Sequence, residues 1–133
     1  MKYLCLIRDE EAKLAAMPTA ESDAFMERYF EFTQSVMASG QYVAGEALQP
    51  AQTAMTVRIR DGKLITTDGP FAETHEQVGG FYLIEARDLT EAVRIAARIP
   101  SAHTGSIEVR PVVDFSQPGA NAEAMKQSAE AHR

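Results

Sequence analysis

The sequence has little of what several protein classes require. Its single cysteine, Cys5, in 133 residues excludes an intramolecular disulfide framework and a CxxC-type zinc or redox site. Basic residues are also scarce, with 13 Lys and Arg against 19 Asp and Glu and a net charge of −6. Nucleic-acid binders carry a basic stripe, and anionic lipid surfaces attract polybasic segments. We therefore expect neither nucleic acid nor a membrane as a partner.

Long apolar runs are missing as well. The longest run near the N-terminus is Tyr3–Ile7, and the charged residues 8–11 follow it directly. A transmembrane helix needs about 20 apolar residues, and a signal peptide needs an apolar region of about 7–15 residues. We therefore expect a soluble, cytoplasmic protein. With 45% apolar residues, the chain can build one core of its own.

Sequence motifs for common cofactors and metals are absent. The chain contains neither a phosphate loop nor a dinucleotide fingerprint, and its histidines show no HxH or HExxH spacing. A metal site would require His75 and His103 to converge with a carboxylate. We expect no cofactor and no metal. Cys5 lies between apolar residues and is expected to be a buried structural thiol.

Strand patterns recur along the chain. Residues 2–8 and 80–86 are apolar on both faces, as in strands buried on both sides. Residues 53–60 alternate between apolar and polar, and Asp61-Gly62 supplies a two-residue turn before residues 63–67 return. Shorter strands are expected at residues 42–48 and 107–113.

Two helices are expected between these strands. Over residues 21–39, apolar side chains recur at three- and four-residue spacing, and Gly40 is placed as a C-terminal cap. Asp88 with Glu91 three residues later predicts a capped helix that ends at Pro100. The alanine-rich segment 119–133 is also capable of forming a helix.

The resulting order predicts an α+β fold, a ferredoxin-like βαββαβ domain with an extra β-hairpin. Two helices cover only one face of a four-stranded sheet, whereas the strands at 2–8 and 80–86 are apolar on both faces. A second copy is the simplest cover for the other face, so we expect a homodimer. We place the domain at residues 1–115 and a helix-capable tail at 116–133.

One dense polar cluster, residues 68–76, carries the candidate catalytic groups. It offers Asp68, Glu73 and His75 close to a strand end. Imidazole suits proton transfer near neutral pH, and a nearby carboxylate can fix its tautomer. The alternative is structural, because Asp-Gly-Pro is turn chemistry and the rest can form a solvated loop.

Arginines on the predicted strands form a second constellation. Arg58, Glu108 and Arg110 lie opposite the apolar stripes of their strands, and Arg8 ends the first strand. If the apolar stripes pack on the helices, these side chains face the space between the sheets of a dimer. Guanidinium groups there suit a small anionic ligand. The alternative is that the arginines form cross-strand salt bridges with Glu108 or Glu46.

Four stretches carry a resemblance to a known family. They are DGPFAET at residues 68–74, GGFYLIEA at 79–86 and IEVRPV at 107–112, together with GEALQP at 45–50. With these motifs the chain resembles the YCII-related family in its DGPF-motif branch. The resemblance implies a ferredoxin-like domain that pairs as a dimeric α/β barrel.

The resemblance implies less about function. The fold resembles that of muconolactone isomerase, and a His–Asp pair in some members suggests enzyme activity. DGPF members are often encoded beside extracytoplasmic-function sigma factors, which suggests a regulatory role instead. Here His75 occupies a position that is usually Lys, and the first predicted helix contains no histidine. The family's His–Asp pair therefore cannot be transferred to that helix.

Three functions remain open from the sequence. The first is a cofactor-free enzyme that performs proton transfer, isomerase- or lyase-like, on a small anionic ligand between the sheets. Asp68, Glu73 and His75 would be its catalytic residues, and Arg8, Arg58, Glu108 and Arg110 would bind the ligand. The second is a non-catalytic ligand-binding or regulatory module, linked to a sigma-factor system. The third is a structural homodimer without a ligand.

Overall fold

The computed structural model describes residues 1–116 and, beyond them, residues 119, 123, 126 and 130. The elements follow one another as β1 (Lys2–Asp9), α1 (Glu11–Ala15), α2 (Thr19–Ala38), β2 (Tyr42–Ala47), the 3-10 turn η1 (Ala51–Thr53), β3 (Met55–Arg60), β4 (Lys63–Asp68), β5 (Gln77–Glu85), α3 (Leu89–Ala96), α4 (Ser101–Thr104) and β6 (Ser106–Pro111). The predicted tail helix at 119–133 falls largely outside the described residues. No helix in the described part is long and apolar enough to cross a membrane.

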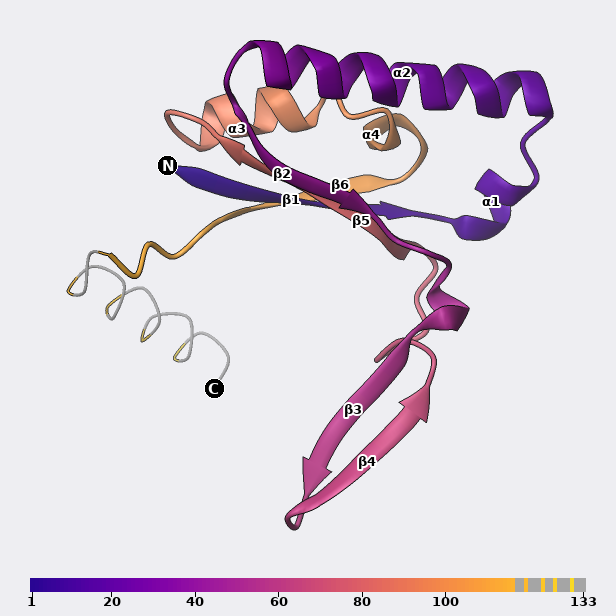
Figure 1. Ribbon diagram of the computed structural model, residues 1–133, viewed down its shortest axis with the longest axis vertical. Coiled ribbons are helices and arrows are strands. Elements are labelled where there is room, and N and C mark those ends of the chain that lie inside the picture. The colour runs from indigo at the N-terminus through magenta and orange to yellow at the C-terminus, as the bar shows by residue number, and fades with distance from the viewer. Residues whose placement is uncertain (117–118, 120–122, 124–125, 127–129, 131–133) are drawn as a thin grey trace.

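Four of the strands form one antiparallel sheet in the order β2-β5-β1-β6. This is the ferredoxin-like βαββαβ arrangement expected from the sequence. Helices α2, α3 and α4 all lie on one face of this sheet (Figure 1). Within residues 1–116 the other face carries no helix, as the count of two long helices predicts.

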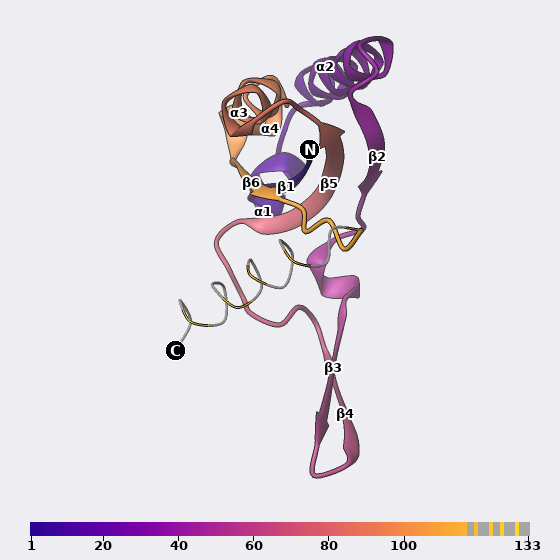
Figure 2. The same cartoon turned by 90° about the vertical axis from the view of Figure 1, so that its left-hand side faces the viewer.

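The remaining two strands form the hairpin that the Asp-Gly turn predicts. Strands β3 and β4 pair with each other in a separate sheet, and we call residues 55–68 the arm. Asp61 and Gly62 both have positive φ, at 53° and 74°, as a type I′ turn requires. The arm projects from the helix-free side of the main sheet in both views (Figures 1 and 2).

The core lies between the helices and the central strands. In β1 the odd-numbered residues are buried, and Leu4, Leu6 and Arg8 on the helix-free face are half-buried. Cys5, one of the odd-numbered residues in the core, is fully buried. Burial raises the pKa of its thiol to about 11, which keeps the thiol protonated. From α2, Phe32 packs edge-on against Tyr82 of β5, with ring centroids 5.1 Å apart. These contacts hold α2 over the sheet.

The boundaries differ from the sequence predictions in three places. Helix α1 was not expected, although its residues 11–15, Glu-Ala-Lys-Leu-Ala, are all good helix formers. Strand β5 begins at Gln77 instead of residue 80, directly after the polar cluster of residues 68–76. Helix α3 ends at Ala96, and a separate short helix, α4, follows Pro100. That short helix supplies part of the candidate site.

Candidate functional site

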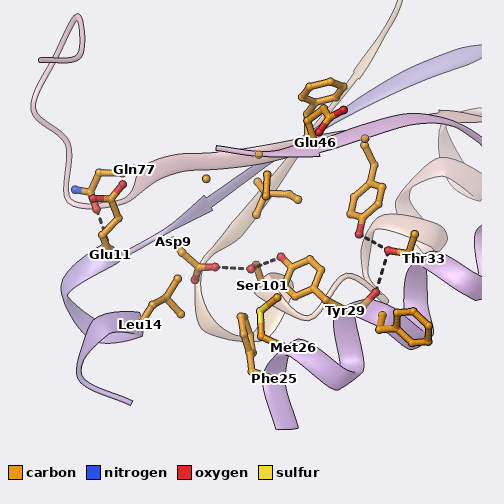
Figure 3. A pocket seen from close by; sticks show the side chains of 18 of the residues that line it. Asp9, Glu11, Leu14, Phe25, Met26, Tyr29, Thr33, Glu46, Gln77 and Ser101 are labelled. Atoms are coloured by element: carbon orange, nitrogen blue, oxygen red, sulfur yellow. Dashed lines mark hydrogen bonds between the residues drawn. The ribbon is translucent and has the colours of Figure 1, made fainter. Parts of the chain in front are cut away.

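A cavity of about 530 Å³ lies between α2 and strands β2 and β5. Ligand pockets commonly fall between about 300 and 1,000 Å³ and are mostly apolar with a few polar groups. This wall has that character, and Figure 3 shows many of its side chains. Its apolar and aromatic side chains include Ile7, Leu14, Phe25, Met26, Tyr29, Phe30, Tyr42 and Tyr82.

A buried carboxylate lies at one end of this cavity. Asp9, the last residue of β1, is only 4% exposed, because the period of two along the strand turns it toward the helices. Ser101 at the start of α4 donates a hydrogen bond to Asp9 Oδ2, and Thr104 Oγ1 donates to Oδ1 at 2.7 Å. Tyr29 of α2 is hydrogen-bonded to Ser101 in turn (Figure 3).

The direction of this chain follows from counting protons. The Ser101 hydroxyl has one proton and gives it to Asp9, so it can only accept from Tyr29. Tyr29 therefore donates to Ser101, and Ser101 donates to Asp9. Burial is the main reason that the pKa of Tyr29 is raised to about 12, so its hydroxyl keeps its proton at neutral pH. We call these three residues the relay.

A second hydroxyl pair lines the wall farther along α2. Thr33 Oγ1 donates to the backbone oxygen of Tyr29 at 2.9 Å. Because that donation uses its only proton, Thr33 accepts from the Tyr82 hydroxyl, 2.6 Å away. Burial also raises the pKa of Tyr82, which keeps this phenol neutral.

The charge on the cavity wall is negative. Its acidic side chains are Asp9, Glu11 and Glu46, and the described lining contains no Lys, Arg or His. Glu46 is paired with Phe81 in the sheet and points away from the cavity (Figure 3), which leaves Asp9 and Glu11 facing it. Glu11 Oε1 accepts the backbone N–H of Ala51 at 2.8 Å. The described residues hold no cluster of three or more His, Cys, Asp or Glu that could bind a metal ion.

The three residues predicted to be catalytic lie outside this cavity. Asp68 ends β4 on the arm, and Glu73 lies in the exposed connection to β5. His75 is in the same connection, and its Nε2 lies 3.0 Å from Glu10 Oε1. The pKa of Glu10 is lowered, first by a hydrogen bond from Lys13 and also by the His75 charge. A catalytic role for these three residues remains a prediction.

Three of the four predicted ligand-binding residues do come together. On the helix-free face, Glu108 lies 3.7 Å from Arg8 and 2.7 Å from Arg110. With Leu4 and Leu6 they line a second hollow of about 300 Å³. Both arginines share one carboxylate, so the cluster has a net charge of +1. Arg58 lies instead on the arm, over the ring of Phe71 at 5.0 Å.

The sequence analysis missed the relay, although one member left a signal. Asp9 continues the odd-numbered series of Tyr3, Cys5 and Ile7, so strand parity alone places it on the buried face. The adjacent glutamates made it look like the start of a solvated loop. Ser101 left no such signal, because its contact spans 92 positions and depends on how α4 packs.

Comparisons with known proteins identify relatives. The model of the YCII-related domain matches residues 1–116. An uncharacterised protein of Rhizobium meliloti (strain 1021) is 36% identical over 121 residues, which is 90% of this chain and 97% of the relative. A solved structure of 5-chloro-2-hydroxyhydroquinone dehydrochlorinase from Burkholderia phenoliruptrix AC1100, in complex with 2,5-dihydroxybenzoquinone, matches with a TM-score of 0.49 and 13% identity. That match covers 84% of this chain and 93% of the other.

Proposed function

The chain belongs to the YCII-related family, and with the geometry above we propose that it is a cofactor-independent enzyme that transfers protons on a small molecule. The ligand occupies the cavity between α2 and the sheet. Asp9 is the group that takes and returns the proton. Ser101 and Tyr29 are positioning residues, because they hold the carboxylate in place through hydrogen bonds.

The observation that supports this proposal most directly is the position of Asp9. This residue is only 4% exposed, and its carboxylate lies on the wall of an apolar cavity. A buried carboxylate is costly to maintain and usually has partners that compensate for its lost hydration. Here two hydroxyls compensate, and no cation does so among the described lining residues. Each carboxylate oxygen has a further lone pair, so Asp9 can still accept a proton from a ligand.

Hydrogen exchange in D₂O tests this proposal without advance knowledge of the product. A library of small metabolites is incubated with the protein, and proton NMR follows the loss of carbon-bound hydrogen signals. We expect exchange in at least one compound and a loss of about 100-fold or more in its rate for Asp9→Asn. Full activity of Asp9→Asn would overturn the assignment. Circular dichroism and thermal unfolding verify that the variant is folded.

The same assay compares this site with the residues predicted from the polar cluster. Asp68→Asn, Glu73→Gln and His75→Ala change exposed groups outside the cavity. With Asp9 as the proton acceptor, all three variants retain their exchange rate within about twofold. If His75→Ala or Asp68→Asn abolishes exchange while Asp9→Asn does not, the catalytic group is the polar cluster.

A second candidate function is binding of a small anion on the helix-free face without turnover. The net positive cluster of Arg8, Glu108 and Arg110 supports it. Sulfate and acetate are the probes, and the shift in unfolding temperature is the measurement. We expect stabilisation that Arg110→Gln removes and Arg94→Gln, on exposed α3, leaves intact. Equal stabilisation of both variants contradicts a site at this cluster.

We also propose that two copies of the chain pair through the helix-free face. Register places Leu4 beside Leu83 and Leu6 beside Phe81 on that face, which forms an apolar centre. Arg8, Arg110 and Glu108 lie at its border. An apolar centre with a polar rim is the usual anatomy of a protein interface. In such a pair the cluster of Arg8, Glu108 and Arg110 lies between the two sheets.

A further inference from the structure

Nearly every hydroxyl on the cavity wall uses its only proton in a hydrogen bond to another group of the protein. Tyr29 donates to Ser101, Ser101 donates to Asp9, and Tyr82 donates to Thr33. Thr33 donates to a backbone oxygen at 2.9 Å. Tyr42 donates to the backbone oxygen of Gly45 at 3.5 Å.

The amide side chains fit the same account. Gln77 Nε2 donates to the backbone oxygen of Thr74 at 2.6 Å, and its Oε1 accepts from the Glu11 backbone at 2.9 Å. Gln34, exposed where the cavity opens, is the one donor side chain of the described lining for which the structure gives no partner. The remaining side-chain polar groups of the wall are acceptors, namely the lone pairs of phenolic, hydroxyl and carboxylate oxygens.

The charges of the lining residues lead to the same conclusion as the hydrogen bonds, namely that the cavity favours a ligand that donates. Asp9 and Glu11 are the charged side chains that face the cavity, and neither has a cation as its hydrogen-bond partner. An anion entering this space would lose hydration and meet like charge without compensation. A ligand that donates hydrogen bonds instead meets acceptors on several sides of an apolar space.

From this proton count we propose that the cavity binds a compact, mainly apolar molecule that carries a hydroxyl or ammonium donor and no negative charge. The inference rests on the proposed function, since it names the ligand class of the same cavity. It separates the two hollows of the sheet by charge: the helix-covered one takes uncharged or cationic donors, and the helix-free one carries the arginines. The anionic ligand expected from the sequence belongs to the space between two sheets, where the arginines lie, and is not assigned to this cavity.

Four probes that share a naphthalene ring substituted at position 2 test the proposal. 2-Naphthol and 2-naphthylmethylammonium each carry a donor, 2-methoxynaphthalene only accepts, and 2-naphthoate is an anion. Binding is followed through the NMR signal of the Met26 methyl group, which lines the cavity, and is assigned with Met26→Leu. We expect the two donors to bind about tenfold more tightly than the other two probes, since an unpaired buried acceptor or a buried like charge weakens binding by a factor of that order.

The failures of the two proposals are distinguishable. Preference for naphthoate or methoxynaphthalene at the Met26 signal overturns the ligand class and leaves the cavity as a binding site. If none of the four probes moves that signal, both the ligand class and the proposed function of the cavity are overturned. Naphthoate that binds without moving it occupies another surface and supports the charge separation.

A substitution on α2 tests the proton count itself. Thr33→Val keeps the side-chain shape but removes the acceptor of the Tyr82 proton, which becomes free to donate into the cavity. We expect the preference for naphthol over methoxynaphthalene to fall at least about fivefold. Thr56→Val is the matched control, because it removes a threonine hydrogen bond of 2.9 Å to Gly69 on the arm. An unchanged preference in Thr33→Val contradicts the inference that the Tyr82 hydroxyl only accepts from a ligand because its proton is held by Thr33.

Discussion

At the scale of single residues, the relay depends on how closely two backbone segments approach. Gly105 follows α4 and lies against the end of β1. A Cβ atom at this position would lie 2.0 Å from the backbone oxygen of Arg8 and 2.7 Å from Asp9 Oδ1. Only a residue without a side chain lets α4 bring Ser101 and Thr104 onto Asp9.

We therefore expect Gly105→Ala to lower the free energy of unfolding by about 3 kcal/mol or more, because backbone atoms cannot move aside as a side chain can. Urea denaturation measures the loss. Gly79→Ala is the control, since a Cβ there meets nothing within 4 Å. Equal stability of the two variants would mean that the contact between α4 and β1 is not tight.

The relay also predicts how the tyrosines titrate. Burial raises the pKa of Tyr29 from 10.0 to about 12. The folded state prefers the neutral phenol, so the stability that this residue contributes is complete below pH 10 and is lost as the pH rises toward 12. In an absorbance titration at 295 nm, we expect a late phenolate step that Tyr29→Phe removes and Tyr42→Phe retains. A late step that persists in Tyr29→Phe belongs to another residue.

At the scale of elements, the start of α3 shows how a local sequence pattern becomes structure. Asp88 Oδ1 accepts the Glu91 backbone N–H at 2.9 Å, as the predicted capping box requires. Glu91 Oε1 accepts the Arg87 N–H at 3.1 Å, one residue earlier than the usual partner. Ala92, Ile95 and Ala96 then face the core, so the cap sets where the buried stripe begins.

Removing this cap is expected to lower the free energy of unfolding by about 1 kcal/mol. Asp88→Ala leaves a helix N-terminal N–H without its acceptor, and such substitutions lower stability by about 0.5–2 kcal/mol. Asp88→Asn keeps an acceptor oxygen and should recover most of the loss. Urea denaturation of both variants measures the difference, and equal losses would show that charge matters here instead of the hydrogen bond.

At the scale of the whole molecule, the two faces of the sheet differ in what covers them. Helices cover one face, and the other carries the half-buried Leu4 and Leu6. The arm projects on that same side and exposes Met55, Val57, Ile59 and Leu64. Its six-residue strands span about 20 Å, whereas stacked sheets lie about 10 Å apart. The arm is therefore long enough to reach past a second sheet.

The proposed pairing predicts a dimer of twice 14.6 kDa. We expect Leu6→Glu to raise the dissociation constant of the dimer, measured by sedimentation equilibrium, by about tenfold or more. The reason is that it buries a charge at the apolar centre of the interface. Leu89→Glu is the control, since Leu89 is 49% exposed at the start of α3. A monomeric wild-type protein at micromolar concentration contradicts pairing through this face.

The sequence by itself determined those features that depend on near neighbours. Alternation predicted the arm and its Asp61-Gly62 turn, and the Asp88 pattern predicted where α3 starts, because turns and caps involve residues within four positions. Strand parity grouped Glu108 and Arg110 with Arg58, and of these the structure brings Glu108 and Arg110 together, beside Arg8 at the end of the first strand. The short helix α1 was missed since its five residues lack a buried stripe.

Only the tertiary structure decided which site the chain builds. The relay joins residues 9, 29 and 101 from three separate elements, and no local pattern marks Ser101 as the partner of Asp9. Arg58 shares its polar alternation with Arg110, yet the arm carries it away from the sheet. Periodicity records which face of a strand a side chain occupies. The packing of distant segments decides what that face meets, and therefore which of the chain's many carboxylates comes to line the cavity.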